Sequence, residues 1–237
     1  MAESSETRLE ALITIVDFSL GKALSNLFKN NNIPIAILIH GYGTAKSVIY
    51  DILGYGSPKK IVTVSIQTKN MSKSIMNQIH NRLDFSKPGT GIAFTISVSS
   101  ISNTLSMICK QADEYLKIGS EGMTVKPKEP YHLIITIVNS GYFEQVMEAA
   151  KKAGATGGTL IHARGLGSKE AIKYLGITIQ PEKDIILILT SQEKKLAIMG
   201  NIMQDVGLNK AGMGICFSLP VNSAMGLGTR IENVDEL

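Results

Sequence analysis

The chain has 237 residues, of which 44% are hydrophobic, 19% charged and 5% aromatic, with 24 Lys and Arg against 20 Asp and Glu. The apolar fraction excludes a disordered chain, and the length suits two small domains or one large one. The basic residues form no run that would follow a nucleic-acid backbone, and Trp is absent, so the composition does not favour nucleic-acid binding.

No stretch reaches the roughly 18 consecutive apolar residues that a membrane-spanning helix needs, so we expect no membrane insertion. The start of the sequence, Met1–Arg8, is polar and acidic, unlike a secretory leader. The two cysteines, Cys109 and Cys216, are far apart and flanked by apolar residues, which is typical of buried thiols in a reducing compartment. These features together predict a cytoplasmic location.

The chain repeats itself at a nearly constant spacing, first of 122 positions (135 − 13 and 162 − 40) and then of 123 (221 − 98). The matching pairs are Ile13–Val16 with Ile135–Val138, Leu38–His40 with Leu160–His162, and Lys87–Val98 with Lys210–Val221. Several matches in the same order predict a duplicated domain, with a first copy at residues 9–101 and a second at 131–225.

The segment between the copies, residues 102–130, begins with apolar residues near helical spacing and continues with Gly and Pro residues. This pattern predicts an extra helix followed by a linker. The apolar residues that carry the helix prediction are Leu105, Ile108, Cys109 and Leu116.

The second copy shows the order of elements most clearly. It starts with a predicted strand, helix and strand, and a glycine-containing loop and a short helical stretch ending near Gly176 follow. A buried strand, a helix and a last strand complete it. The predicted ranges are Leu133–Asn139, Tyr142–Lys152, Thr159–Ala163, Asp184–Thr190, Glu193–Val206 and Ile215–Val221.

The same βαββαβ order in both copies predicts an α+β fold. We expect two tandem ferredoxin-like domains, each a four-stranded antiparallel sheet with helices on one face. Strands such as Ile185–Leu189 are apolar on both faces, so the face without helices also needs a cover. We therefore expect the chain to form a homo-oligomer.

Two glycine-containing loops recur in both copies. One follows the second strand, as His40–Ser47 and His162–Ala171, and the other precedes the last strand, as Lys87–Gly91 and Lys210–Gly214. Glycine lets the backbone turn and approach an anion closely, so such loops can bind phosphate. A plain turn also explains these glycines, and the residues alone leave both interpretations open.

His40 and His162 end the second strand of each copy, where an imidazole can bind a metal or titrate. No second histidine lies at ligand spacing in either copy, which favours a structural role and predicts no metal site. The sequence also lacks a Ser/His/Asp elbow, a CxxC pair and an HExxH helix. We therefore expect that the protein is not an enzyme.

The duplicated βαββαβ units, the segment RGLGSKEA at Arg164–Ala171 and the segment GMGICFSLPV at Gly212–Val221 resemble the PII nitrogen-regulatory signal-transduction family. The resemblance covers most of both copies and is tighter in the second. It implies a homotrimer, with a dimer as the alternative, and an adenine nucleotide bound between neighbouring domains. The ligand-binding residues that it implies are Gly165, Gly167, Ser168, Lys169, Lys210, Gly212 and Gly214, and in the first copy Gly41, Gly43, Thr44, Lys46, Lys87, Gly89 and Gly91.

Departures from the family pattern bear on the ligand. Ile215 stands where the family has a Lys, and Arg230 alone replaces the paired C-terminal arginines. Because charge-assisted contacts to phosphate are the strong ones, we expect a weaker dependence on the terminal phosphate, with AMP, ADP or ATP as possible ligands and no other cofactor.

The resemblance implies a non-catalytic regulator that binds a small anionic ligand, an adenine nucleotide above all, between domains and regulates an unidentified protein partner. The alternative is a structural or divalent-metal-handling trimeric ferredoxin-like protein without nucleotide sensing.

Overall fold

The computed structural model describes residues 8–44, 58–85, 87, 90–116, 130–165, 172–174, 177–179, 182–208 and 214–227. The chain divides into two compact units. Unit 1 comprises Met1–Ile39, Lys60–Lys128 and Val221–Leu237, and unit 2 comprises His40–Lys59 and Glu129–Pro220. Each unit therefore includes a short segment from the other half of the sequence.

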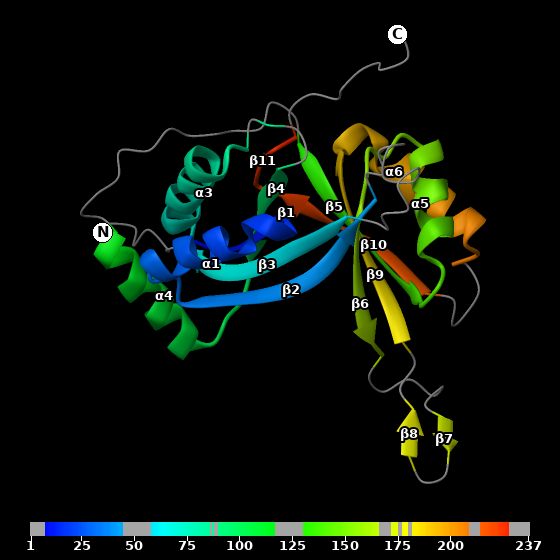
Figure 1. The fold of residues 1–237 in the computed structure, drawn as a ribbon, viewed down its shortest axis with the longest axis horizontal. Coiled ribbons are helices and arrows are strands. Elements are labelled where there is room, and N and C mark those ends of the chain that lie inside the picture. The colour runs from blue at the N-terminus through cyan, green and yellow to red at the C-terminus, as the bar shows by residue number, and fades with distance from the viewer. Residues whose placement is uncertain are drawn as a thin grey trace, which may run out of the picture. The chain divides into compact units, whose positions relative to one another are not determined.

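The sheet of unit 1 has the strand order β2-β3-β1-β4-β11 (Figure 1). Its central strand β1 pairs antiparallel with β3 and β4, and β11 pairs antiparallel with β4. These strands are β1 (Leu9–Asp17), β2 (Ile35–Gly43), β3 (Lys59–Thr68), β4 (Gly91–Val98) and β11 (Ser223–Met225).

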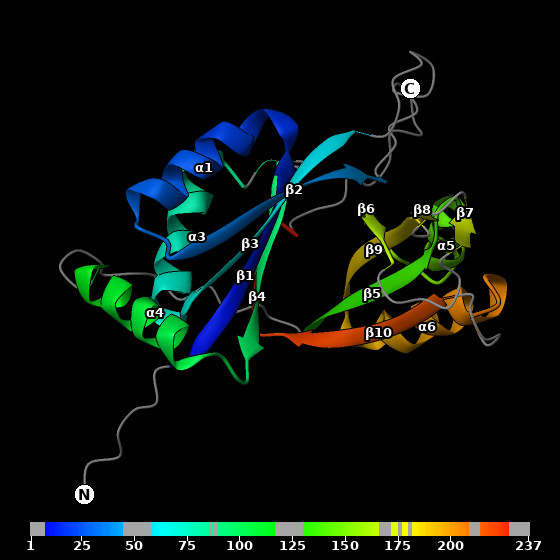
Figure 2. The same cartoon turned by 90° about the horizontal axis from the view of Figure 1, so that it is seen from below.

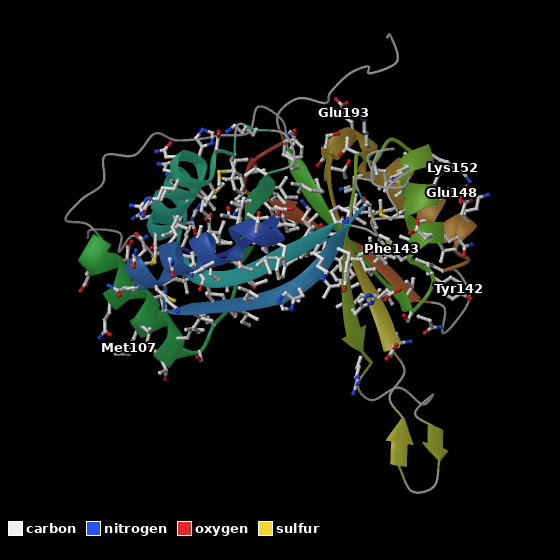
Figure 3. All side chains as sticks on the ribbon, viewed as in Figure 1. Met107, Tyr142, Phe143, Glu148, Lys152 and Glu193 are labelled. Carbon is white, nitrogen blue, oxygen red and sulfur yellow. The ribbon has the colours of Figure 1, made fainter. Side chains whose placement is uncertain are left out.

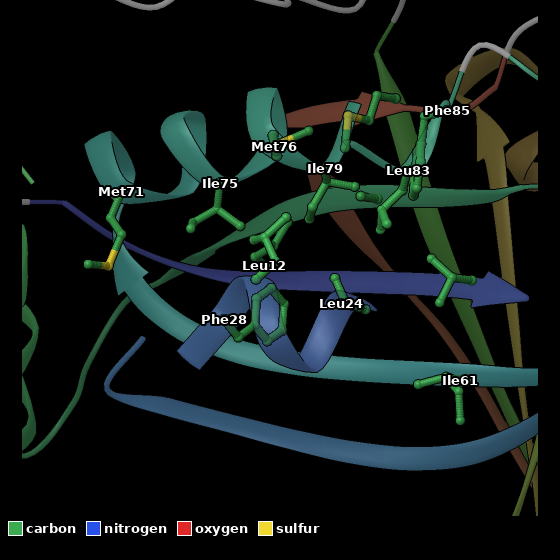
Figure 4. Close-up of a cluster of buried hydrophobic side chains, with 14 of the residues drawn as sticks. Leu12, Leu24, Phe28, Ile61, Met71, Ile75, Met76, Ile79, Leu83 and Phe85 are labelled. Carbon is green, nitrogen blue, oxygen red and sulfur yellow. The ribbon is translucent and has the colours of Figure 1, made fainter. Parts of the chain in front are cut away.

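Helices α1 (Gly21–Asn30) and α3 (Lys69–Leu83) cover one face of this sheet, and the short helix η1 (Phe18–Leu20) leads into α1. Figure 4 shows Ile75 and Ile79 of α3 pointing toward Leu12 on β1. These three side chains are fully buried, and each contributes about 1.5–3 kcal/mol relative to an exposed position. Helix α4 (Asn103–Leu116) occupies the segment for which the sequence predicts an extra helix.

The sheet of unit 2 has the order β10-β5-β9-β6, with the end of β2 next to β6. Strand β9 pairs antiparallel with β5 on one side and with β6 on the other. Helices α5 and α6 pack against each other and share one apolar core with the sheet (Figure 2). The elements are β5 (Tyr131–Asn139), α5 (Phe143–Lys152), β6 (Thr159–Arg164), β9 (Glu182–Ser191), α6 (Gln192–Asp205) and β10 (Gly214–Val221).

Helix α5 illustrates how the apolar spacing produces these elements. Val146 and Ala150, four positions apart, are fully buried, whereas Glu148 and Lys152 lie on the exposed face and form an ion pair at 3.3 Å (Figure 3). The helix ends at Lys152, and Gly154, two residues later, has a φ of +90°, in the left-handed region that favours glycine.

The short helical stretch predicted to end near Gly176 is wrong. Ile172–Tyr174 form strand β7, which pairs antiparallel with β8 (Ile177–Ile179) in a separate two-stranded sheet. The β-branched and aromatic residues in these two segments favour strands, and this preference outweighs the short apolar spacing that suggested a helix.

The predicted α+β fold is confirmed. The order β1-α1-β2-β3-α3-β4 is repeated as β5-α5-β6-β9-α6-β10, with β7 and β8 inserted between β6 and β9. The boundaries 9–101 and 131–225, and the duplication that they describe, stay predictions. Within the described ranges, no helix is long and apolar enough to span a membrane.

Candidate functional site

The structure describes half of the predicted ligand residues. The described residues are Gly41, Gly43, Thr44, Lys87, Gly91, Gly165 and Gly214. The residues outside the described ranges are Lys46, Gly89, Gly167, Ser168, Lys169, Lys210 and Gly212. For all of them, contact with a ligand stays a prediction.

Gly91 and Gly214 start the last strand of each βαββαβ order, and close backbone packing explains both glycines. A Cβ atom on Gly91 would collide with the carbonyl oxygen of Ile15, and one on Gly214 with the carbonyl oxygen of Ile137. Gly214 also has a φ of +149°, a backbone conformation that residues other than glycine rarely adopt. Each glycine therefore has a structural role that does not require a ligand.

Thr44 is buried and holds the end of β2 next to β6 in unit 2. Its hydroxyl accepts a hydrogen bond from the Gly158 amide at 2.6 Å, and its own amide donates to the Gly158 carbonyl at 3.0 Å. Gly43 continues this contact by pairing with Thr159. The polar groups of Thr44 are thus engaged within the protein.

Lys87 is an exposed cation in unit 1, three residues after Asp84, which follows α3. The two side chains form an ion pair at 2.6 Å, and the hydrogen bond and the negative charge of Asp84 raise the pKa of Lys87. The carboxylate offsets part of the positive charge that Lys87 would offer to a phosphate.

His162 on β6 is held by a buried carboxylate on the neighbouring strand. Its Nδ1 lies 2.9 Å from Oδ1 of Asp184, the residue directly opposite in the β6–β9 register. Asp184 is 2% exposed and also accepts hydrogen bonds from the Gly141 amide at 3.1 Å and the Ser140 hydroxyl at 3.4 Å. An ionised carboxylate only accepts hydrogen bonds, so the network assigns a proton to Nδ1 and leaves Nε2 for other partners.

A hollow of about 450 Å³ lies beside this pair at the end of β6 and β9. Arg164 and Glu182 face each other across the two strands, and the ammonium of Lys183 donates to Oδ1 of Asn139 at 2.5 Å. Three of its lining residues, His162, Ala163 and Arg164, begin the predicted loop His162–Ala171. Its lining residues are Ser140, His162, Ala163, Arg164, Glu182 and Lys183.

Sequence reasoning singled out His162 but missed Asp184 as its partner. The available signal was a single carboxylate at the first position of an otherwise apolar run, Asp184–Leu189. A carboxylate at the start of a buried strand needs hydrogen-bond donors, and a histidine near the end of another strand can supply one. The pattern within either strand does not show that the two residues are opposite.

The first half of the chain does not repeat the His162–Asp184 pair. Val16 pairs with Ile61, whereas the corresponding Val138 pairs with Asp184, so Ile61 occupies the place of Asp184. Ile61 belongs to the apolar core of unit 1. The buried carboxylate therefore distinguishes the second half of the chain from the first.

In the described ranges, no three His, Cys, Asp or Glu side chains gather in an arrangement that could bind a metal ion. Cys109 and Cys216 are both free thiols, the first buried and the second half-buried. Burial raises the pKa of both, and a hydrogen bond from the Thr136 hydroxyl partly opposes this effect at Cys216.

The family model described as Nitrogen regulatory protein P-II matches residues 131–230. No curated protein sequence matches the chain.

Solved structures with some similarity include a PII protein of Arabidopsis thaliana bound to citrate, at 22% identity and a TM-score of 0.31, covering 40% of this chain and 79% of that one. A GlnK of B. subtilis is 17% identical with a TM-score of 0.30 and covers 38% and 84%. The divalent ion tolerance protein CutA1 of Ehrlichia chaffeensis is 13% identical with a TM-score of 0.35 and covers 46% and 97%.

Proposed function

We propose that the chain is a non-catalytic PII-like regulator that binds an adenine nucleotide and acts on a protein partner, because residues 131–230 match the family model of nitrogen regulatory protein P-II. The family match is the observation that carries the proposal, because it spans both predicted ligand loops of the second copy. In this proposal the glycines of the two loops present backbone amides, and Lys169 and Lys210 supply positive charge to the phosphates.

The strand order of unit 2 supports a nucleotide position between domains. One predicted loop follows β6 and the other precedes β10, and these strands are separated by β9 and β5. At about 4.8 Å per strand spacing, β6 and β10 lie roughly 14 Å apart. The two strands are thus not adjacent, and we propose that a loop from a neighbouring domain completes the site.

Ile215 gives the proposal a specific ligand preference. It is 57% exposed at the start of β10, immediately after Gly214. An apolar side chain there supplies no charge to a terminal phosphate, so we propose that AMP and ADP bind about as readily as ATP.

Calorimetric titration of the full chain with ATP, ADP and AMP tests the proposal. We expect Lys169→Gln and Lys210→Gln each to weaken nucleotide binding about tenfold, the usual effect of losing one charge-assisted hydrogen bond. Lys73→Gln, on the exposed side of α3, is the matched control and should leave the affinity unchanged. Gly214 is unsuitable for this test, because a side chain there collides with Ile137.

Two results would contradict the proposal. Nucleotide binding that is the same in both lysine variants as in the unmodified chain would place the site elsewhere. A chain that binds none of the three nucleotides but responds to divalent cations in the same titration would support the metal-handling alternative.

A further inference from the structure

The hollow at the end of β6 and β9 combines charges of both signs, and the nucleotide proposal does not use them. Arg164 and Lys183 are cationic donors, whereas Glu182 and Nε2 of His162, in the tautomer that Asp184 imposes, are acceptors. All of these residues belong to unit 2.

The imidazole of His162 is fixed from two sides but remains accessible. Asp184 holds Nδ1 at 2.9 Å, and the ring of Tyr42 packs against the imidazole with the ring centroids 5.6 Å apart. The His162 side chain is nevertheless 60% exposed. A ring held in one orientation, with Nε2 available, is preorganised to accept a hydrogen bond from a ligand.

Arg164 and Glu182 place a cation and an anion at neighbouring positions on β6 and β9. They are directly opposite in the β6–β9 register, and both are exposed. In the part of the chain that the structure describes, no ion pair joins these two side chains. Lys183, the next residue on β9, points to the opposite face of the strand from Glu182, and its ammonium donates to Oδ1 of Asn139.

This arrangement discriminates against ligands that carry one kind of charge. A simple anion near Arg164 meets the carboxylate of Glu182, and a simple cation near Glu182 meets the guanidinium of Arg164. An α-amino acid carries a carboxylate and an ammonium group on one carbon atom. The volume of about 450 Å³ lies within the range of small-molecule sites.

We propose that the hollow binds a free α-amino acid, with its carboxylate at Arg164 and its ammonium group at Glu182 and Nε2 of His162. Asp184 is then a positioning residue that acts through His162. The equivalent place in the first half of the chain is occupied by Ile61, so we expect one such site per chain.

Calorimetric titration of the full chain with L-alanine, L-glutamate and L-lysine, each alone, tests the proposal. L-lactate is the matched probe for L-alanine, because it carries a hydroxyl group where L-alanine carries an ammonium group. We expect at least one of the three amino acids to bind, and L-alanine to bind about tenfold more tightly than L-lactate, in keeping with one lost charge-assisted contact.

Variants assign the binding to the hollow. Arg164→Gln should weaken amino-acid binding about tenfold, and Glu182→Gln should reduce the preference for L-alanine over L-lactate. Arg82→Gln on α3 and Glu148→Gln on α5 are controls with the same change of charge at exposed positions, and both should bind as the unmodified chain does.

The proposal is overturned if none of the three amino acids binds, if L-lactate binds as tightly as L-alanine, or if Arg164→Gln and Arg82→Gln behave alike. Nucleotide titration of the same preparations separates the two proposals. A chain that binds nucleotide but no amino acid contradicts this inference alone, and the reverse result contradicts only the nucleotide proposal.

Discussion

At Gly91 and Gly214 the absence of a side chain allows the start of a strand to pack closely against the backbone of the neighbouring strand. We predict that Gly91→Ala and Gly214→Ala each lower the free energy of unfolding by about 1–3 kcal/mol, because the new Cβ collides with a backbone carbonyl that cannot easily move. Urea denaturation measures this change.

Gly200, inside α6, provides the control for these glycines. A Cβ there meets no atom within 4 Å, so Gly200→Ala should raise the free energy of unfolding by about 0.5–1 kcal/mol through the better helix propensity of alanine. A loss of stability at Gly200 as large as that at Gly214 would contradict the steric explanation.

The two thiols supply a second prediction at the residue scale. Burial raises the pKa of Cys109 and Cys216, so less of each is thiolate at a given pH than in the unfolded chain. We expect a thiol reagent at pH 8 to modify both more slowly in the folded protein than in urea, with Cys109, which is fully buried, the slower. Equal rates in the folded and unfolded protein would contradict this.

At the scale of elements, α3 and α6 start at corresponding places but with different caps. The hydroxyl of Thr68 accepts a hydrogen bond from the Met71 amide at 3.2 Å, whereas Ser191 makes no such side-chain bond before α6. We predict that Thr68→Val lowers the free energy of unfolding by about 1 kcal/mol. Ser191→Ala should have a smaller effect, and thermal denaturation compares the two.

Among the helices and strands, local sequence patterns are sufficient to predict some elements but not others. The predicted helix at Tyr142–Lys152 agrees within one residue with α5, because its apolar spacing and its glycine stop are both local signals. The segment before Gly176 lacked signals of this strength. It contains only a few apolar residues, so the intrinsic preference of Ile172–Tyr174 for a strand decided its structure.

For the whole molecule, the sheet face that α5 and α6 leave uncovered predicts association. Cys216 packs toward the core of unit 2, so Ile215 and Phe217 point to the opposite face, where they are 57% and 38% exposed. We predict a homotrimer, with a mass three times the 25.6 kDa of the chain in light scattering.

Charged substitutions test which surface carries this association. Phe217→Lys should shift the oligomer toward the monomer, because the interface would bury an unpaired charge. Leu196→Lys, at a side chain of α6 that is 74% exposed, should not change the mass. A stable monomer at micromolar concentration would contradict the prediction, and a dimer would contradict the trimer alone.

The sequence by itself determined the α+β class and the repeated βαββαβ order, because hydrophobic periodicity, glycine stops and recurring segments are all local patterns. Only the tertiary structure placed Asp184 opposite His162, placed Ile61 at the corresponding position, and gave Gly214 a packing role. The physical reason is strand register: which residues face each other depends on how separate strands align. The pattern within one strand specifies only which of its own residues share a face.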